Sequence, residues 1–239
     1  MPAPKSHIVV IGGTSALGLD IAKAAHAAGC QVTIAGRGAE RAAGVATSIG
    51  AGVTGVHIDL EDSASIGPAL REGPPIDHLV ITAIMRLATT VKDFNVKEAE
   101  RLVRVKLVGY VEAVSAALPR LKPTSSIVLF AGVSKSNPYP GSTMISTVNG
   151  GVVGMTKTMA VELAPIRVNC ISPGLVLDSP IWKTILAKGP NPVVDAMAAK
   201  TPTKRLAMTE DVIAGVFALL DNKAINGIDL ELDGGIQLV

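Results

Sequence analysis

Aromatic residues are scarce in this chain, and neither sign of charge dominates it. Of its 239 residues, three are Phe, two are Tyr and one is Trp, so no surface for stacking nucleic-acid bases is expected. The formal net charge is +2, and the lysines and arginines form no cluster that could follow a phosphate backbone. The composition therefore argues against nucleic acid as a partner.

Long apolar runs and cysteines are also few. The first apolar run, in MPAPKSHIVVIGG, is ended by glycines after a few residues, which is too short for a signal-peptide core or a membrane span. We therefore expect a cytoplasmic protein with no membrane partner. That setting disfavours disulfides, so Cys30 and Cys170 are expected to be reduced thiols in the core. No spacing of Cys, His and Asp resembles a metal site, so no metal is expected.

The abundant residues are small and aliphatic. Hydrophobic residues make up 48% of the chain and charged residues 18%. A chain so rich in Ala, Val and Gly suits buried parallel strands that helices cover on both faces. The length fits one α/β domain with a large core. Since no repeat or linker interrupts the chain, residues 1–239 are predicted to form a single domain.

Short β-type runs alternate with helical patterns along the whole chain. This alternation predicts right-handed βαβ crossovers and a doubly wound parallel sheet of seven strands. The predicted strands begin at His7, Gln31, Val53, His78, Ser126, Arg167 and Ile228, and the predicted helices span about Ala16–Ala28, Glu40–Ile49, Ser63–Arg71, Lys97–Leu118, Thr143–Leu163 and Thr209–Leu220. An irregular region, Pro173 to Met208, contains five prolines and is expected to be a substrate loop or lid. A short helix is expected near Val193–Lys200.

A glycine-rich turn joins the first predicted strand to the first predicted helix. It reads GGTSALGL over residues 12–19. Gly12 would allow a tight turn, and Gly18 would let the helix and the strand pack closely. The N-terminus of the helix would then present free N–H groups and a positive dipole end to a pyrophosphate. The alternative is a turn with a structural role only, but its place between strand and helix favours dinucleotide binding.

This turn resembles the TGxxxGxG pattern of the short-chain dehydrogenase/reductase family, with Ile11 at the threonine and Ala16 at the middle glycine. The segment STMISTVNGGVVGMTKTMAVEL, from Ser142, resembles the long active-site helix of that family. Further matches are Leu79-Val80, Asn169 in RVNCISPG, and Asp233-Gly234-Gly235. The resemblance extends from His7 to Gly235 and implies a Rossmann-type fold that binds a nicotinamide dinucleotide.

The resemblance also assigns the residues around the cofactor. Arg37 stands where an acidic residue would hold the ribose of NAD, and a guanidinium there can pair with a 2′-phosphate, which favours NADP(H) over NAD(H). The alternative for Arg37 is a solvated surface arginine. Asp59 matches the aspartate that lies beside the adenine amine. The expected cofactor-binding residues are Gly12, Thr14, Ser15, Leu17, Gly18, Arg37, Asp59, Leu60, Ala83, Asn149, Pro173 and Gly174.

The catalytic group that the resemblance implies is absent. Members of the family use a tyrosine as acid and base, a lysine that lowers its pKa, a serine that orients the carbonyl, and an asparagine that supports a water. A tyrosine, with a pKa of about 10, needs such a cation to work at neutral pH. The four corresponding positions hold Ile145, Asn149, Gly132 and Lys106. The chain is therefore identified as a divergent member with a non-standard active site.

Lys106 is the most informative of these replacements. On the predicted helix Lys97–Leu118 it shares a face with Tyr110 and with Ala113-Val114. A buried ammonium beside a cofactor could serve as a proton donor or bind an anionic substrate. The alternative is a lysine that extends to solvent or pairs with an acid. Other polar candidates near the expected site are Ser134, Lys135, Ser142, Ser146, Arg86 and Asp178, with Tyr139 as a substitute acid.

Three functions are compatible with these residues. The favoured one is an NADP(H)-dependent oxidoreductase whose small-molecule substrate is already activated, such as an iminium or a conjugated electrophile. The others are a non-redox enzyme (an isomerase, cyclase or dehydratase) and an inactive NADP(H) sensor or subunit. Through the resemblance, the helices at 97–118 and 143–163 would form a homodimer or homotetramer. The alternative for Gly150, Gly151 and Gly154 is close packing within the chain.

Overall fold

The computed structural model describes residues 1–85 and 87–239 and contains one parallel sheet of seven strands. The strand order is β3-β2-β1-β4-β5-β6-β7, which is the doubly wound arrangement that the sequence predicts. The strands are β1 (His7–Ile11), β2 (Gln31–Gly36), β3 (Val53–His57), β4 (Ile76–Ile81), β5 (Leu121–Phe130), β6 (Arg167–Pro173) and β7 (Asp229–Leu232).

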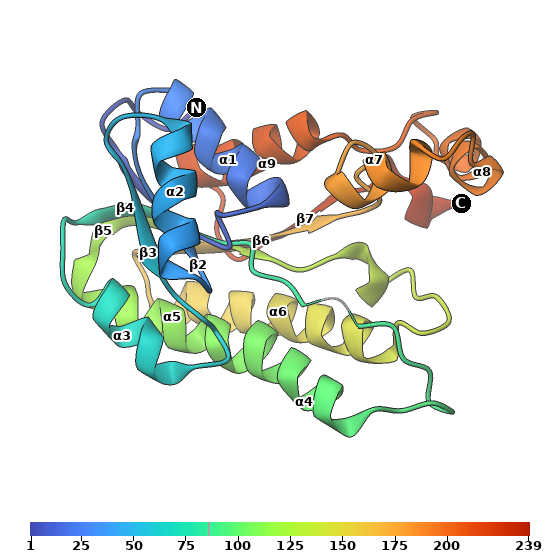
Figure 1. Cartoon of the computed structure of the whole chain (residues 1–239), viewed down its shortest axis with the longest axis horizontal. Helices are drawn as coiled ribbons and strands as arrows, with labels where there is room; N and C mark the ends of the chain where they lie inside the picture. The colour runs from blue at the N-terminus through green and yellow to red at the C-terminus, as the bar shows by residue number, and fades with distance from the viewer. Residues whose placement is uncertain (86) are drawn as a thin grey trace.

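Helices cover both faces of the sheet (Figure 1). One face carries α1 (Ala16–Ala27), α2 (Ala39–Ile49) and α9 (Thr209–Asp221); the other carries α3 (Ser63–Leu70), α4 (Val96–Val103), α5 (Gly109–Ala117) and α6 (Thr143–Glu162). Two further helices, α7 (Pro180–Leu186) and α8 (Pro192–Lys200), lie together toward the C-terminus of the chain. Short 3₁₀ turns are η2 (Leu118–Arg120), η3 (Val133–Lys135) and η4 (Ile236–Leu238).

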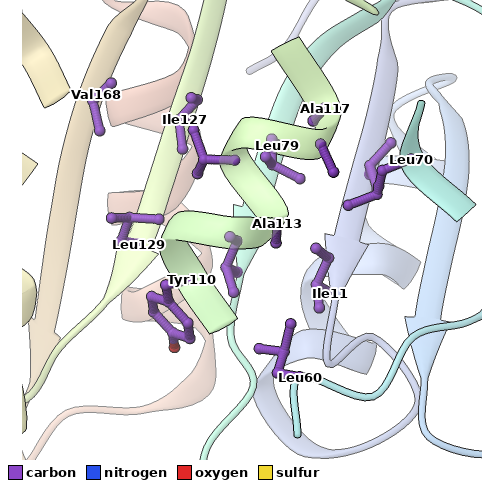
Figure 2. Close-up of a cluster of buried hydrophobic side chains, with 14 of the residues drawn as sticks. Ile11, Leu60, Leu70, Leu79, Tyr110, Ala113, Ala117, Ile127, Leu129 and Val168 are labelled. Carbon is purple, nitrogen blue, oxygen red and sulfur yellow. The ribbon is translucent and has the colours of Figure 1, made fainter. Parts of the chain in front are cut away.

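The apolar composition is used to bury the sheet on both sides. All five residues of β1 are buried, as expected for a central strand with helices above and below it. On the α5 side, Ile11, Leu79 and Leu129 pack against Ala113 and Ala117, and Figure 2 shows α5 lying across these strands. A second core joins α1 and α9 to the opposite face. The two cores hold the sheet between helices, so the loops at the ends of its strands start from fixed positions.

The direction of the strand order reverses between β1 and β4. These two strands are parallel neighbours, with Ile11 paired to Ile81, and their crossovers leave toward opposite faces of the sheet. In open α/β sheets ligands bind at such a switch point, beyond the carboxyl ends of the strands. A ligand is therefore expected to contact the segments that follow β1 and β4, and the segment after the neighbouring strand β5.

The helix predicted over Lys97–Leu118 is present and contains one irregular turn. Between α4 and α5 the chain forms one π-helical turn, η1 (Arg104–Val108), in which the N–H of Gly109 donates to the carbonyl of Arg104. Lys106 lies in the middle of this turn. The sequence does not reveal this π-helical turn inside the predicted helix, because the same residues suit an α-helix and a π-helical turn equally well. Single π-helical turns are rare and often occur at functional sites.

The region Pro173 to Met208 is more regular than the sequence predicts. The helix expected near Val193–Lys200 is α8, but α7 was not expected. Its first residue, Pro180, suits the first turn of a helix because proline lacks only an N–H that would be unpaired there. None of the residues of α7 is buried.

Two smaller expectations can be compared with the structure directly. Cys30 and Cys170 are both free and buried, as predicted. Within residues 1–85 and 87–239, no helix has the length and apolar character needed to cross a membrane. The same residues contain no group of three or more His, Cys, Asp or Glu side chains placed to hold a metal ion.

Candidate functional site

The glycine-rich turn after β1 forms a cradle built from backbone. Gly12 has φ of +89°, and a Cβ on it would lie 2.6 Å from Thr82 Oγ1. A Cβ on Gly18 would lie 2.3 Å from the carbonyl oxygen of Gly12. Neither position can accept a side chain without moving the backbone. The turn and the end of β4 are therefore as close together as the sequence predicts from its glycines.

The N-terminus of α1 leaves its N–H groups available. Ser15 is the N-cap residue, yet its side chain accepts no capping hydrogen bond, and the first turn of α1 contains no acidic residue. The first N–H groups of a helix have no partner inside the helix and carry the positive end of its dipole. Such a terminus binds phosphate groups well. The residues present therefore fit a dinucleotide pyrophosphate.

Ala16 departs from the glycine pattern, and it keeps the glycine-like backbone. Its φ is +46°, in the left-handed region that alanine rarely adopts. The turn therefore has the shape that a glycine would give it, with a strained alanine at the position. The methyl group is exposed on the side of the turn that faces solvent.

Replacing Ala16 with glycine is expected to raise the free energy of unfolding slightly. The left-handed region costs alanine about 1–2 kcal/mol, and the freedom of glycine in the unfolded chain costs about 0.4–1 kcal/mol, so the net gain is roughly 0.5 kcal/mol. Urea unfolding measures the difference. The control is Ala43→Gly, at an exposed position inside α2, which is expected to lose about 1 kcal/mol. Equal losses in both variants would contradict the strain at position 16.

The residues expected around the adenosine lie in different environments. Arg37 follows β2 and is exposed, and among the described residues no hydrogen bond or ion pair holds it. Asp59 Oδ1 accepts the N–H of Glu61 at 3.0 Å. Leu60 is only 3% exposed and packs against Gly109, where a Cβ would lie 2.8 Å from Leu60 Cβ. Its side chain is thus part of the core, as Figure 2 also shows.

The remaining candidates lie at the carboxyl ends of the strands. Ala83 follows β4, and its backbone N would lie 2.8 Å from a Cβ on Gly12. Thr14 packs against Gly36, where a Cβ would meet its Cγ2 at 2.6 Å. The other members of the set are Leu17, which is half-buried against the core, and Pro173 and Gly174 at the end of β6. The structure therefore brings the glycine turn, the end of β2 and the end of β4 together.

Three buried polar side chains, Lys106, Asn149 and Ser134, form a row at the carboxyl end of β5. Lys106 Nζ donates to Asn149 Oδ1 at 2.9 Å and to the carbonyl of Ala131 at 3.2 Å. Asn149 Nδ2 donates to Ser134 Oγ at 2.9 Å. Lys106 is 1% exposed, Asn149 4% and Ser134 7%. These three side chains come from η1, α6 and η3, so the row connects both helices to the end of β5.

The ammonium of Lys106 has no anionic partner. No carboxylate of the described residues lies within ion-pair distance of it, and its two acceptors are neutral. Burial therefore lowers the pKa of Lys106 to about 7. Like Lys106, the residues Tyr110, Ala113 and Val114 are buried. The alternative, a lysine that reaches solvent or pairs with an acid, is wrong.

Comparison with known proteins agrees with the dinucleotide cradle. Residues 12–237 match the family described as Enoyl-(Acyl carrier protein) reductase. The chain belongs to the short-chain dehydrogenase/reductase family. This short-chain dehydrogenase/reductase family binds a nicotinamide cofactor, and the cradle formed by Gly12, Gly18 and the start of α1 fits one.

Two relatives and two solved structures illustrate which members of the family this chain is similar to. Short-chain dehydrogenase/reductase malC of Malbranchea aurantiaca is 27% identical, over 97% of this chain and 94% of the relative. Inactive 2-(S)-hydroxypropyl-CoM dehydrogenase 2 of Xanthobacter autotrophicus is 30% identical, over 92% and 100%. The structure of MalC reductase/Diels-Alderase matches with a TM-score of 0.90 at 25% identity, covering 99% of this chain and 98% of that one. A small-chain dehydrogenase in complex with NADPH matches with a TM-score of 0.82 at 27% identity, covering 98% and 100%.

At the catalytic positions of the short-chain dehydrogenase/reductase family, the replacements fit one another. A Cβ on Gly132 would lie 2.9 Å from Asn149 Nδ2, so the side chain of Asn149 occupies the room that a serine would need. The sequence resemblance assigns Lys106 and Asn149 to the asparagine and lysine positions of the family, and in the structure these two side chains are hydrogen-bonded to each other. Ile145 is half-buried on α6 and has no polar atom in its side chain. Gly132, Asn149 and Lys106 are therefore packed against or bonded to one another.

The environments of the two tyrosines differ. Tyr110 is fully buried, and its hydroxyl donates to the carbonyls of Ala83 at 2.8 Å and Phe130 at 3.4 Å. Burial raises the pKa of Tyr110 well above its ordinary value, which is the opposite of what an acid near neutral pH needs. Tyr139 is 56% exposed, in the loop before α6.

Most of the other polar candidates have structural partners. Asp178 accepts hydrogen bonds from the backbone and hydroxyl of Thr209, at the start of α9. Ser146 Oγ donates to Ser142 Oγ, at the start of α6. The ammonium of Lys135 pairs with Asp229 and Glu231 of β7, and Arg86 lies outside the described residues. Ser134 alone joins the row of Lys106. Ser134 is already a candidate from the sequence, and the structure sets it apart from the others through its hydrogen bond with Asn149.

Proposed function

We propose that this chain is an NADP(H)-dependent oxidoreductase with a non-standard active site that reduces an activated small molecule. The observation that carries the proposal is the dinucleotide cradle, in which Gly12 and Gly18 leave no room for a side chain and α1 keeps its first N–H groups free. A chain that had stopped using a cofactor would have little reason to keep a cradle this tight. The proposed contacts are those of the twelve cofactor-binding residues expected from the sequence.

The preference for NADP(H) rests on Arg37. Its guanidinium is exposed and free of partners among the described residues, at the end of β2 where the ribose 2′ position is expected. An unpaired arginine is suited to a 2′-phosphate because its planar fork can donate two parallel hydrogen bonds. A bound NADPH would supply the hydride for the reduction.

The chain's own residues then set which substrate can react. Ile145 cannot exchange a proton, and the only described amine in the site is buried behind Asn149. A plain ketone needs proton transfer to its oxygen as the hydride arrives, whereas an iminium or a conjugated electrophile needs little help. We therefore propose an activated C=N or C=C–C=O group as the substrate class. The segment with α7 and α8 is the proposed substrate lid.

NADPH is expected to raise the melting temperature of the protein, and NADH is expected to raise it much less. A ligand present at 100 times its dissociation constant raises the free energy of unfolding by about 2.7 kcal/mol. For a domain of this size each kcal/mol shifts the melting temperature by about 2–4 °C, so a rise of roughly 5–10 °C follows. Differential scanning fluorimetry measures it. Arg37→Ala is expected to remove the preference for NADPH, while the exposed control Arg71→Ala keeps it.

The two parts of this expectation can fail separately. No shift with either nucleotide would refute dinucleotide binding altogether. Equal shifts with NADH and NADPH would refute the role of Arg37 and leave the cradle. Reduction itself is followed by the loss of NADPH absorbance on panels of imines, enones and plain ketones, and turnover of the ketones alone would contradict the proposed substrate class.

Two other functions keep a specific observation in their favour. A solved relative is named a reductase and Diels-Alderase, which supports a non-redox enzyme, such as a cyclase, that uses the site for shape and charge. Another relative is named an inactive dehydrogenase, which supports a sensor or subunit. Product formed without NADPH consumption would favour the first, and nucleotide binding without any turnover would favour the second.

A homodimer or homotetramer is proposed from the outer face of α4, η1 and α6. An apolar groove of about 360 Å³ lies there, lined mainly by Phe94, Val96, Ala99, Val103, Val108 and Met144. Val108, Val111 and Val161 are exposed, and a Cβ on Gly150 or Gly154 would meet nothing within 4 Å. Only Gly151 packs within the chain, against Leu107. These features favour a second copy as the partner of this face.

A further inference from the structure

The hydrogen bonds of the buried polar row all run from donor to acceptor in one direction, from Lys106 through Asn149 to Ser134. Lys106 is only a donor, so the atom of Asn149 that faces it must be the amide oxygen. The amide nitrogen of Asn149 then faces Ser134, and it must donate to the hydroxyl oxygen. The proton of the Ser134 hydroxyl is therefore left over. No described residue accepts it, so this end of the row has a donor to offer.

Ser134 also has the best place of the three for meeting a substrate. It lies in η3, directly after the carboxyl end of β5, which neighbours β4 at the switch point. Gly132 and Val133, just before it, are half-buried rather than buried. Lys106 is deeper, with Asn149 between it and Ser134. A substrate that reaches this edge of the sheet would meet the hydroxyl before the ammonium.

The turn that carries Ser134 is held from two sides. The adjacent Lys135 is tied to Asp229 at 2.9 Å and to Glu231, both on β7. Asn149 holds the hydroxyl from α6, and its own orientation is fixed by Lys106. A donor fixed in this manner needs no reorganisation when charge develops on a substrate atom.

We propose that Ser134 is the hydrogen-bond donor that contacts the substrate, and that Lys106 and Asn149 are positioning residues that hold it. The proposal rests on the proposed function, since it assumes that a nicotinamide cofactor binds beside this edge of the sheet. It replaces Lys106 as the contact residue. It also agrees with an activated substrate, because a serine hydroxyl polarises a carbonyl or an imine but is too weak an acid to protonate it at neutral pH.

The first test needs no substrate. Ser134→Cys places a thiol at the same position, and a small methanethiosulfonate reagent reports whether it can be reached. The two native cysteines are buried, so the wild type supplies the background. Ser134 is 7% exposed and Cys30 5%, so the introduced thiol is expected to react slowly, at a rate measured above the wild-type background, and saturating NADPH is expected to slow this reaction at least about tenfold. Ser136→Cys, at an exposed position in the same loop, is the control and should react equally with and without NADPH.

The outcomes distinguish failure of the Ser134 proposal from failure of the proposed function. If NADPH shifts the melting temperature of the wild type and the thiol at position 134 stays unreactive, Ser134 does not face the site and the proposal is overturned. Reaction at an unchanged rate with NADPH overturns it as well. If NADPH gives no shift with the wild type, the proposed function fails first and this proposal fails with it.

A second test separates the positioning role from a structural one. In Ser134→Cys the chain of Lys106 and Asn149 should favour the thiolate while Lys106 is protonated, because a positive charge behind the amide makes it a better donor. Adding Lys106→Met is therefore expected to slow alkylation by iodoacetamide about threefold at about pH 6, below the Lys106 pKa of about 7, which equals a thiol pKa about half a unit higher. An unchanged pH profile would show that Lys106 supports the fold only.

The third test uses any substrate that the NADPH screen finds. Ser134→Ala is expected to lower kcat by about 10²–10³, as removal of a fixed donor to a developing negative charge does, with the NADPH-induced melting shift unchanged. Ser134→Thr keeps a hydroxyl and is expected to recover much of the rate. Equal turnover by Ser134→Ala and the wild type would overturn the proposal.

Discussion

Asn149→Lys is expected to destabilise the protein severely, even though the sequence resemblance assigns a lysine to this position in the family. The amide oxygen of Asn149 accepts from Lys106 Nζ at 2.9 Å, so the variant replaces this acceptor with a second ammonium. The described surroundings offer no carboxylate to either one. An uncompensated buried charge costs about 3–5 kcal/mol, which is a large part of the 5–15 kcal/mol that stabilises a typical domain.

Adding Lys106→Asn is expected to recover most of that loss. The double variant exchanges the two residues, so that one ammonium and one amide again face each other. Urea unfolding of the wild type, both single variants and the double variant gives a complete cycle, and a coupling of at least about 2 kcal/mol is expected for groups in direct contact. Asn149→Gln, which keeps an amide, is the control for a change in size alone. Additive losses would show that Lys106 and Asn149 do not act as a pair.

The same contacts determine how the family's site could be rebuilt. A serine at position 132 would bring its Cβ to 2.9 Å from Asn149 Nδ2, so it needs the exchanged pair first. A tyrosine at position 145 is useful only with a lysine at position 149 to lower its pKa. Ile145→Tyr alone should therefore give no carbonyl reduction. Because these side chains contact one another, rebuilding the family's site is expected to need several substitutions together.

The sheet and the cradle could be predicted because their signals are local. Each strand is a short apolar run between turns, and strand order follows from the handedness of the crossovers. The roles of Gly12 and Gly18 follow from the absence of a Cβ, and the structure supports them because a Cβ added at either position would lie only 2.3–2.6 Å from its nearest neighbour. Ala16 shows the limit of this reasoning. Its left-handed φ of +46° is imposed by the surrounding turn, against the preference of alanine.

The arrangement around Lys106 could not be predicted, because it depends on contacts between distant segments. The π-helical turn of η1 has no sequence pattern of its own, and it places Lys106 against the end of β5. Lysine at position 106 and asparagine at position 149 read separately as two losses. Only the distance of 2.9 Å between their polar atoms shows that the two side chains act on each other. Ser134 is one of several polar candidates in the sequence, and its bond to Asn149 singles it out.

The buried ammonium of Lys106 should also appear in the pH dependence of stability. Its pKa is about 7 in the folded protein and near 10.5 in the unfolded chain, as for an ordinary lysine. Between these values the unfolded chain binds more protons, so stability rises with pH across that window. Below about pH 7 both states are protonated, and the cost of the buried charge is constant.

Lys106→Met removes this term and leaves the others in place, so the difference between wild type and variant isolates it. Each pH unit is equivalent to about 1.4 kcal/mol, and the wild type should therefore gain about 2–3 kcal/mol on the variant between about pH 7 and pH 9. Urea unfolding at several pH values measures the gain. Lys157→Met, on the exposed side of α6, should run parallel to the wild type. A constant difference between wild type and Lys106→Met would mean that Lys106 keeps its proton throughout, and a permanently charged amine at this place would favour an anionic substrate over a hydroxyl donor at Ser134.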